Sequence, residues 1–511
     1  MSLPVLETER VMDVENDLMA RGTSLELLID RAVRGCSDWI TKNYPRVEFP
    51  AVGILAGSGH NGADALGIAA HLLDEGRLVC AILSAGEDKL KPATRAALQA
   101  FNQKGGKTHF ATSNDFLKFD DQQDSPWTVP SLWIDGLQGT GLNRPLANPS
   151  QALVMRVQAQ NKPIVAIDIP SGLQGNLGHF QQLHSNCIHA SETLALGCLK
   201  PVHVLDTCLE ALGKVHLIPL GFEEIIAESS SATCFALTVE DLTDLLKSAR
   251  RRPASHKFKN GRVLIVAGSE KYPGAAVMTC MGAGISGAGM VHALVPSEAR
   301  QAILNHTPEV ILERHLPELS SFDAVVMGPG WVPADEQMFN KVMQHVAEHE
   351  NCFAVLDAGV FEVLEKEFGN GRKLNSRCLL TPHGGEFARL FPGISVDNRN
   401  GNINSIEAAK QAAFACNAIV FAKGARSCIA FPEGSADVIL ESTPLLAHAG
   451  QGDVLAGLLG GLLARMKDPK GAARLAALLQ AQAALRFSKR CPAALTISPL
   501  ELVQQIRMLD F

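Results

Sequence analysis

The stretch from Ala449 to Asp453 places two glycines, one residue apart, directly before an aspartate and an apolar helical run. Glycine lets the backbone turn sharply and expose consecutive N–H groups, and a helix start adds unpaired N–H groups and partial positive charge. The stretch therefore predicts an anion-binding pocket beside a carboxylate. Phosphate binding alone would not require Asp453, so the pairing suits a reaction that handles a phosphate while a hydroxyl loses its proton. An isolated motif of this length is more often a loop with a capping aspartate, so its meaning depends on the rest of the chain.

The second half of the chain supplies several further strand ends that could face this turn. Apolar, β-branched runs follow Gly261 and Asp323 and recur at 353–356, 379–380 and 419–422, and a small-residue helix is expected over 276–286. Such runs are typical of buried parallel strands, and their alternation with helices predicts an α/β sandwich with its chemistry at the strand ends. The turns that follow these strands contain Gly268, Gly330, Asp357, His383 and Lys423.

The first half shows the same pattern. A buried strand at 51–56 runs into the glycine-rich turn 57–64 and a helix expected over 65–73, and strands at 132–135 and 163–168 end on acids. Ligands of open parallel sheets bind at the carboxyl ends of the strands. Three oxygen donors fall there, which favours a hard cation over a thiolate site, and Asp168 is left as a candidate acid or base. The expected cation ligands are Asn61, Asp135 and Ser171.

Composition limits the class of protein. A chain of 511 residues with 46% hydrophobic and 19% charged residues predicts a globular protein of two to four domains. A net charge of −7 argues against a nucleic-acid scaffold. The 12 cysteines form no Cys-x-x-Cys pair, which favours free thiols in the reducing cytoplasm. We expect no signal peptide, and no membrane contact, because no apolar run reaches the ~20 residues of a membrane helix.

A change in composition marks the expected domain boundary. Residues 221–234 include two adjacent glutamates and three adjacent serines. The expected domains are therefore 1–224 and 237–511, joined by a linker at about 225–236.

The first-half motifs resemble those of the NAD(P)H-hydrate epimerase domain. The matching stretches are 57–64, 135–142 and 168–173, within a resemblance that covers roughly residues 9–220, although Ala63 and Ala65 stand where that family usually has glycine. The resemblance implies a potassium ion on Asn61, Asp135 and Ser171, and substrate contact by Asp168. It also implies a substrate site for NADHX and NADPHX, the hydrated forms of NADH and NADPH, lined by His60, Asn61, Gly62, Ala63, Asp64, Gly139, Thr140, Gly141, Leu142, Asn143, Arg144 and Pro145.

The second half looks like the ADP-dependent NAD(P)H-hydrate dehydratase domain, over roughly 237–511. Five separated motifs occur in order: 256–262, 286–289, 381–387, 423–427 and 450–453. The resemblance implies a ribokinase-like α/β domain, preceded by a Rossmann-like three-layer α/β/α domain. It implies hydrate contacts by Ala275, Gly330, His383 and Asp453, and nucleotide contacts by Lys423, Gly424, Ala425, Arg426, Ser427 and Gly452.

Both domains in this order resemble the bifunctional NAD(P)H-hydrate repair enzymes, which implies an isomerase and a lyase activity. The ring hydroxyl would be phosphorylated by ADP, with Mg²⁺ accompanying the nucleotide. Asp453 would take the hydroxyl proton, and AMP and phosphate would be released. The alternatives are a ribokinase-like small-molecule kinase and a non-catalytic binding role for the N-terminal half. A homo-oligomer is compatible with the sequence, which carries no feature that decides it.

Overall fold

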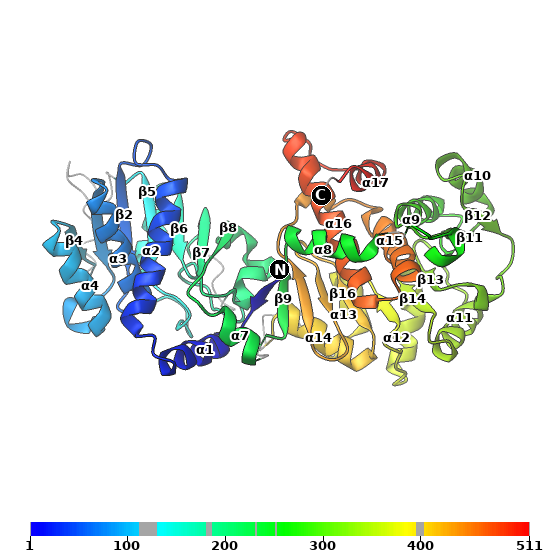
Figure 1. The fold of residues 1–511 in the computed structure, drawn as a ribbon, viewed down its shortest axis with the longest axis horizontal. Coiled ribbons are helices and arrows are strands. Elements are labelled where there is room, and N and C mark those ends of the chain that lie inside the picture. The colour runs from blue at the N-terminus through cyan, green and yellow to red at the C-terminus, as the bar shows by residue number, and fades with distance from the viewer. Residues whose placement is uncertain are drawn as a thin grey trace. The chain divides into compact units, whose positions relative to one another are not determined.

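A computed structural model describes residues 2–111, 130–179, 187–229, 232–250, 253–394 and 403–509. The chain forms two compact units. Of the described residues, one unit contains 4–233 and 403–404, and the other contains 2–3, 234–394 and 405–509. We call them the N-terminal and C-terminal units. Each is built on its own sheet (Figure 1).

The N-terminal unit contains a seven-stranded sheet in which every pair of neighbouring strands is parallel. The order is β4-β3-β2-β5-β6-β7-β8. The strands are β2 (Ala51–Ala56), β3 (Leu78–Leu83), β4 (Lys107–Phe110), β5 (Leu132–Gly136), β6 (Ile164–Ile167), β7 (Glu192–Leu196) and β8 (Lys214–Ile218), and the helices are α1 (Thr8–Ala20), α2 (Leu25–Asn43), α3 (His60–Asp74), α4 (Pro92–Gln103), α5 (Ser150–Gln158), α6 (Leu209–Leu212) and α7 (Glu223–Ser229).

Side chains that alternate along the central strands divide this unit into three layers. Ile54 of β2 belongs to one apolar cluster with residues of α2, α3 and α4. Its neighbour Leu55 belongs to another, with Trp133 and Leu153 of α5. Because successive side chains of a strand point to opposite faces, these helices must cover both faces of the sheet. The predicted three-layer α/β/α arrangement is confirmed.

The C-terminal unit contains an eleven-stranded sheet in the order β1-β9-β18-β17-β16-β15-β14-β13-β10-β11-β12. The seven strands from β16 to β12 run parallel, whereas β17 is antiparallel to both of its neighbours. The strands are β1 (Leu3–Val5), β9 (Cys234–Leu237), β10 (Arg262–Val266), β11 (Met290–Leu294), β12 (Ile311–Glu313), β13 (Ala324–Met327), β14 (Phe353–Leu356), β15 (Cys378–Leu380), β16 (Ile419–Ala422), β17 (Cys428–Ala430) and β18 (Ala436–Ile439).

Helices α9 and α15 are the most closely packed pair of this unit. A side chain at Gly282 of α9 would collide with the backbone of α15, and one at Gly457 of α15 would collide with the backbone of α9. Gly460 gives α15 the same close approach to Val326 of β13. This packing holds α15, whose start is the glycine-rich motif of the sequence analysis, against α9 and β13. The helices are α8 (Val239–Ala249), α9 (Pro273–Ile285), α10 (Ser297–His306), α11 (Glu336–Glu348), α12 (Phe361–Gly369), α13 (Gly384–Leu390), α14 (Ser405–Cys416), α15 (Gln451–Met466), α16 (Pro469–Arg490) and α17 (Pro499–Arg507).

Two sequence expectations differ from these elements. The predicted linker 225–236 contains most of α7 and three residues of β9, while Ser230 and Ser231 lie outside the described residues. Strand β9 has only four residues and follows a polar run, so it has little periodicity to detect. Helix α3 begins at His60 rather than Ala65, because the extended Gly59 provides its N-cap. Among the described residues, no helix combines the length and apolar character of a membrane span.

The position of β9 leads to a prediction about domain truncation. Strand β9 pairs in parallel with β18 over Cys234–Leu237. We expect a fragment of residues 232–511 to fold with a cooperative thermal transition, and a fragment of residues 238–511 to be destabilised, because its β18 loses a backbone hydrogen-bonding partner. Circular dichroism melting of both fragments measures the difference. Equal melting temperatures would show that β9 is a dispensable extension.

Candidate active sites

The first candidate site is the turn that begins α15. Gly450 is the N-cap and has φ +92°, a left-handed conformation that favours glycine. A side chain there would also collide with Met278 of α9. Gln451 anchors the next position, since its side-chain amide donates to the Ile497 carbonyl at 2.7 Å. The first-turn N–H groups of a 16-residue helix are thus presented with Asp453 beside them.

Asp453 faces a lysine and a second carboxylate. Burial and the charge of Asp357 raise the pKa of Asp453 to about 7, although the Lys423 ammonium lowers it. Within the described residues, no hydrogen bond is made to the Asp453 carboxylate, so its oxygens are available to a ligand. A carboxyl group with a pKa near neutral pH is matched to proton removal there. This geometry makes Asp453 a suitable general base.

The Lys423 ammonium contacts two acids, one directly after β14 and one in α13. Its Nζ lies 2.9 Å from Asp357 Oδ1 and 3.9 Å from Glu386 Oε2, and it is close to Gly452. Asp357, which is 1% exposed, also accepts a hydrogen bond from Thr381 at 2.7 Å. Burial lowers the pKa of Lys423, but the charges of Asp357 and Glu386 outweigh it, so the pKa lies above its ordinary value. The ammonium therefore stays charged beside the helix start.

His383 stands at the N-cap of α13. Its Nδ1 accepts from the Gly385 backbone N–H at 3.0 Å, and the backbone N–H of His383 donates to Glu386 Oε2 at 2.9 Å. Because Nδ1 is an acceptor, the neutral ring carries its proton on Nε2. Nε2 lies 3.4 Å from Glu386 Oε1, and the side chain is 61% exposed, so the rest of the ring is accessible to a ligand. A backbone bridge between His383 and Lys423 keeps these two residues adjacent.

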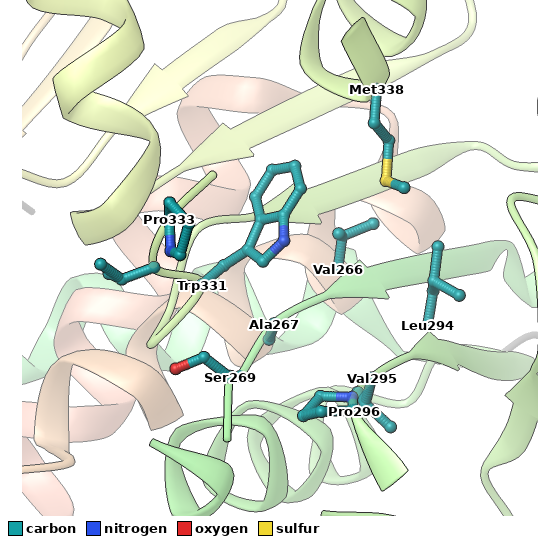
Figure 2. A pocket seen from close by; sticks show the side chains of 11 residues that line it. Val266, Ala267, Ser269, Leu294, Val295, Pro296, Trp331, Pro333 and Met338 are labelled. Atoms are coloured by element: carbon teal, nitrogen blue, oxygen red, sulfur yellow. The ribbon is translucent and has the colours of Figure 1, made fainter. Parts of the chain in front are cut away.

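Ala275 and Gly330, two predicted hydrate contacts, lie together. Gly330 has φ +61°, and a Cβ there would lie 2.6 Å from the Ala275 Cβ. The following residue, Trp331, lines a pocket of about 280 Å³ near the carboxyl ends of β10 and β11 (Figure 2). Its wall is mostly apolar and consists of Val266, Ala267, Gly268, Ser269, Leu294, Val295, Pro296, Trp331, Val332, Pro333 and Met338.

The predicted nucleotide contacts form the turn between β16 and β17. Lys423 begins this turn, and Gly424 and Ala425 are exposed, whereas Arg426 is buried. The Gly424 N–H donates to Ser427 Oγ at 3.5 Å, which closes the turn. Gly452 of α15 lies beside this turn, because a Cβ on Gly452 would be 3.4 Å from Lys423 Nζ. The structure thus brings these residues together at one end of the central sheet.

The second candidate site lies in the N-terminal unit, where two of the predicted cation ligands touch. Ser171 donates to Asp135 through its hydroxyl at 2.7 Å and its N–H at 2.8 Å. Asn61 donates to the Gln138 carbonyl at 2.7 Å, and that carbonyl also accepts weakly from Ser171 Oγ at 3.4 Å. Burial raises the pKa of Asp135 to about 6, against the hydrogen bonds from Ser171. The cluster is rich in oxygen, and a cation would relieve the cost of its buried charge.

Asp168 is held by a buried lysine. Its backbone is left-handed, with φ +64°. Lys200 Nζ lies 2.6 Å from Asp168 Oδ1 and 2.7 Å from the Leu196 carbonyl, and His203 Nε2 lies 2.7 Å from the Asp168 carbonyl. Burial lowers the pKa of Lys200, but Asp168 and neighbouring acids raise it above its ordinary value. Oδ2 of Asp168 has no hydrogen-bond partner in the described ranges, so one carboxylate oxygen is fixed and the other is open.

The remaining predicted epimerase residues divide between the site and the core. His60 to Asp64 form the first turn of α3, and burial, followed by the charges of Asp168 and Glu15, raises the pKa of Asp64 well above its ordinary value. A Cβ on Gly139 would lie 3.3 Å from the Asn61 side chain. Thr140 and Gly141, with Asn143 to Pro145, lie along the same surface turn. The side chains of Ala63 and Leu142 are buried, and Leu142 joins an apolar cluster, so neither offers a side chain to a ligand.

The sequence analysis assigned no role to three residues of these sites. Asp357 was noted only as a turn residue after a strand, Glu386 was recognised only within the motif 381–387, and Lys200 was not recognised. Asp357 follows a buried strand directly, which is the same signal that identified Asp135. Lys200 lies four residues after β7 and is 1% exposed, a position at which lysine is rare unless it is paired. Its role is evident only from its ion pair with Asp168, which the sequence does not show.

Two family models match this chain. One, described as NAD(P)H-hydrate dehydratase, matches residues 263–507, and the other, described as YjeF-related protein N-terminus, matches residues 25–202. They fall on the C-terminal and N-terminal units respectively. The two candidate sites therefore lie in separately recognised domains.

Relatives cover both units at once. The bifunctional NAD(P)H-hydrate repair enzyme Nnr of Gloeobacter violaceus is 34% identical over 480 residues, 91% of this chain and 89% of its own. The enzyme of that name from Mycobacterium tuberculosis is 32% identical over 413 residues, 80% of this chain and 78% of its own. A crystal structure of the ADP/ATP-dependent NAD(P)H-hydrate dehydratase of Bacillus subtilis with ATP/Mg²⁺ is 29% identical and covers 53% of this chain and 96% of its own, with a TM-score of 0.46. The chain belongs to the family of bifunctional NAD(P)H-hydrate repair enzymes.

Proposed function

We propose that the turn of α15 carries out the dehydration of NAD(P)H hydrates, with Asp453 as general base. The observation that carries this assignment is the open carboxylate of Asp453, whose pKa is raised to about 7 by burial and Asp357, beside a glycine-rich helix start. Asp453 takes the proton of the ring hydroxyl, and the hydroxyl oxygen bonds to the terminal phosphorus of ADP. The bond from that phosphorus to the bridging oxygen breaks and AMP leaves.

In the second half of the reaction, the ring nitrogen of the substrate drives the loss of phosphate. The lone pair of the ring nitrogen forms a C=N bond as the carbon–oxygen bond breaks and phosphate leaves. Loss of a proton from the adjacent ring carbon then restores the dihydropyridine of NAD(P)H.

The N–H groups from Gly450 to Gly452, with the Lys423 ammonium, stabilise charge on the transferring phosphoryl group. Mg²⁺ takes phosphate, water and carboxylate oxygens, and Asp357 and Glu386 offer such oxygens. It would neutralise phosphate charge there.

For the N-terminal unit we propose epimerisation of the R and S hydrates at the site around Asp168. Inversion at the hydroxylated carbon requires its bond to the ring nitrogen to break as the hydroxyl loses its proton and becomes an aldehyde. The open Oδ2 of Asp168 would carry that proton from the oxygen to the nitrogen, and back when the nitrogen re-closes on the opposite face, while Lys200 holds Oδ1. The oxygen-rich cluster of Asn61, Asp135 and Ser171 suits K⁺, because its donors are hard and buried. The ion would supply positive charge beside the turns that face the substrate's pyrophosphate. Supply of the S hydrate by this unit would let the dehydratase use both epimers.

The base assignment predicts the effect of Asp453→Asn. We expect dehydration of S-NADHX with ADP to fall about 10²–10⁴-fold, the usual contribution of a positioned base, while ADP binding stays nearly intact. Absorbance of NADH and release of orthophosphate measure the reaction, and calorimetric titration measures binding. A stable phosphoester product from the unmodified protein would instead favour the kinase alternative, and turnover of the variant at the original rate would refute the base.

The raised pKa of Asp453 predicts a pH dependence. Asp453 acts only when ionised, so kcat/KM should rise with pH until about 7. Asp357→Asn removes a negative charge that raises this pKa, so the rising limb should move to lower pH, although the maximal rate falls. As a control, Glu336→Gln removes an exposed carboxylate of the same unit and should leave the limb in place, because solvent and salt screen its charge. If Asp357→Asn does not move the rising limb of the pH profile, that limb reports the titration of another group.

The pairing of Asp168 with Lys200 predicts that both are needed for epimerisation. The full chain would be supplied with only the R epimer of NADHX and ADP. Asp168→Asn keeps a residue that tolerates positive φ, and Lys200→Met removes the ammonium. Both should slow conversion of the R epimer to the spontaneous rate, while the S epimer is dehydrated at the original rate by the same preparation. Conversion of the R epimer by Asp168→Asn at the original rate would mean that this unit is not an epimerase.

A further inference from the structure

The pocket beside Trp331 lies away from the reaction centre, in the same unit. Lys423 and Asp357, which surround Asp453, follow β16 and β14 respectively. The pocket residues follow or end β10, β11 and β13. In the sheet order β14-β13-β10-β11, the strands that carry the pocket lie one to three strand spacings from β14, about 5 to 14 Å at roughly 4.8 Å each. The pocket therefore extends across the sheet, away from Asp357.

The chemistry of the pocket wall fits a flat aromatic ring. The Trp331 indole faces Met338 and Val266 across the hollow, with Pro296 and Val295 on its opposite rim (Figure 2). Ser269 adds one hydroxyl to this apolar lining. Aromatic bases stack on such side chains without needing a set of hydrogen bonds. Among the lining residues none carries a charge, so the pocket is unsuited to a phosphate.

The protein backbone holds the pocket in place. The Trp331 N–H donates to the Gly328 carbonyl at 3.0 Å, and the Gly268 N–H donates to the Pro329 carbonyl at 2.7 Å. A side chain on Gly359 would collide with the Trp331 carbonyl. The indole therefore projects from a turn that is fixed on both sides. The pocket is also continuous with the predicted hydrate contact at Gly330, which precedes Trp331 in this turn.

We propose that this pocket binds the adenine ring of the NAD(P)H hydrate, while the hydrated nicotinamide ring lies at Asp453. This inference rests on the proposed function of the C-terminal unit. The ring that carries the hydroxyl must reach Asp453 within hydrogen-bonding distance, which leaves the other ring of the dinucleotide for the pocket. Two riboses and a pyrophosphate join the rings, and this linkage is long enough to cover the separation. The predicted nucleotide turn at 423–427 lies on the other side of β14, so ADP extends in the opposite direction.

The test compares two substrates that share the reacting ring. One is S-NADHX, and the other is the corresponding hydrate of reduced nicotinamide mononucleotide, which lacks the adenosine half. Trp331→Ala should raise KM for S-NADHX about tenfold, within the range measured for losing one base stack, with kcat nearly unchanged. The same variant should leave kcat/KM for the mononucleotide hydrate and KM for ADP unchanged. Trp331→Phe should restore most of the affinity for S-NADHX.

The controls separate this proposal from the function on which it rests. Phe414→Ala removes an aromatic side chain that is 68% exposed on α14 of the same unit and should change none of these constants. Equal losses for both substrates with Trp331→Ala would place the hydrated ring in the pocket, and a raised KM for ADP would place the nucleotide there. If Trp331→Ala leaves KM unchanged for S-NADHX, the mononucleotide hydrate and ADP, the pocket binds no part of either substrate. Failure of the unmodified protein to dehydrate S-NADHX would instead refute the proposed function.

Discussion

The buried contact between Lys423 and Asp357 is the constraint around which the C-terminal site is arranged. Asp357 is almost fully enclosed, and a carboxylate in that position is costly unless it is paired. The lysine satisfies it, but Lys423 then lies between three acids, counting Glu386 and Asp453. One ammonium cannot neutralise three carboxylates. Burial and then the negative charge of Asp357 raise the pKa of Asp453, although the Lys423 ammonium lowers it. Asp453 lies in the first turn of α15, at the positive end of that helix.

The N-terminal unit solves a similar problem with the same pair of residue types. Lys200 and Asp168 are buried together. Burial, followed by the charges of Asp168 and Glu15, raises the pKa of Asp64. Burial also raises the pKa of Glu15, with Lys200 lowering it and Asp168 raising it. Here too one buried lysine interacts with several acids at the carboxyl edge of a parallel sheet. The pairs differ in what they leave open. Lys423 pairs with a neighbour of the base, whereas Lys200 binds one oxygen of the proposed acid–base residue itself and leaves the other oxygen free.

The sequence predicted the strands and the turns better than the contacts between them. Buried parallel strands are continuous apolar runs, so β2, β10, β14 and β16 were recognisable, and the start of α15 followed from its glycines. Lys200 could not be found in this way, because its importance comes from Asp168, 32 residues earlier. Strand β9 was placed in a linker because four residues show no periodicity. Helix α3 was started too late because glycine-rich residues from His60 are poor helix formers, and tertiary contacts decide otherwise.

Departures from the family pattern are explained by packing. Ala65 stands where the family usually has glycine, and its methyl group is fully buried. It points at Gly136, where an added Cβ would lie only 2.5 Å away. A glycine on the neighbouring strand therefore provides the room for this methyl group, which is directed into the core and not toward a ligand.

Gln451, which stands where the dehydratase family commonly has threonine, is also held by packing and hydrogen bonds. Its amide binds the Ile497 carbonyl, and its own carbonyl accepts from Gln480 of α16 at 3.0 Å. The residue between the two glycines thus joins the anion-binding turn to the elements behind it. The Gln451 side chain is therefore turned toward Ile497 and is separate from the Asp453 carboxylate, which no hydrogen bond within the described residues occupies. Variation at position 451 is therefore compatible with unchanged chemistry at position 453.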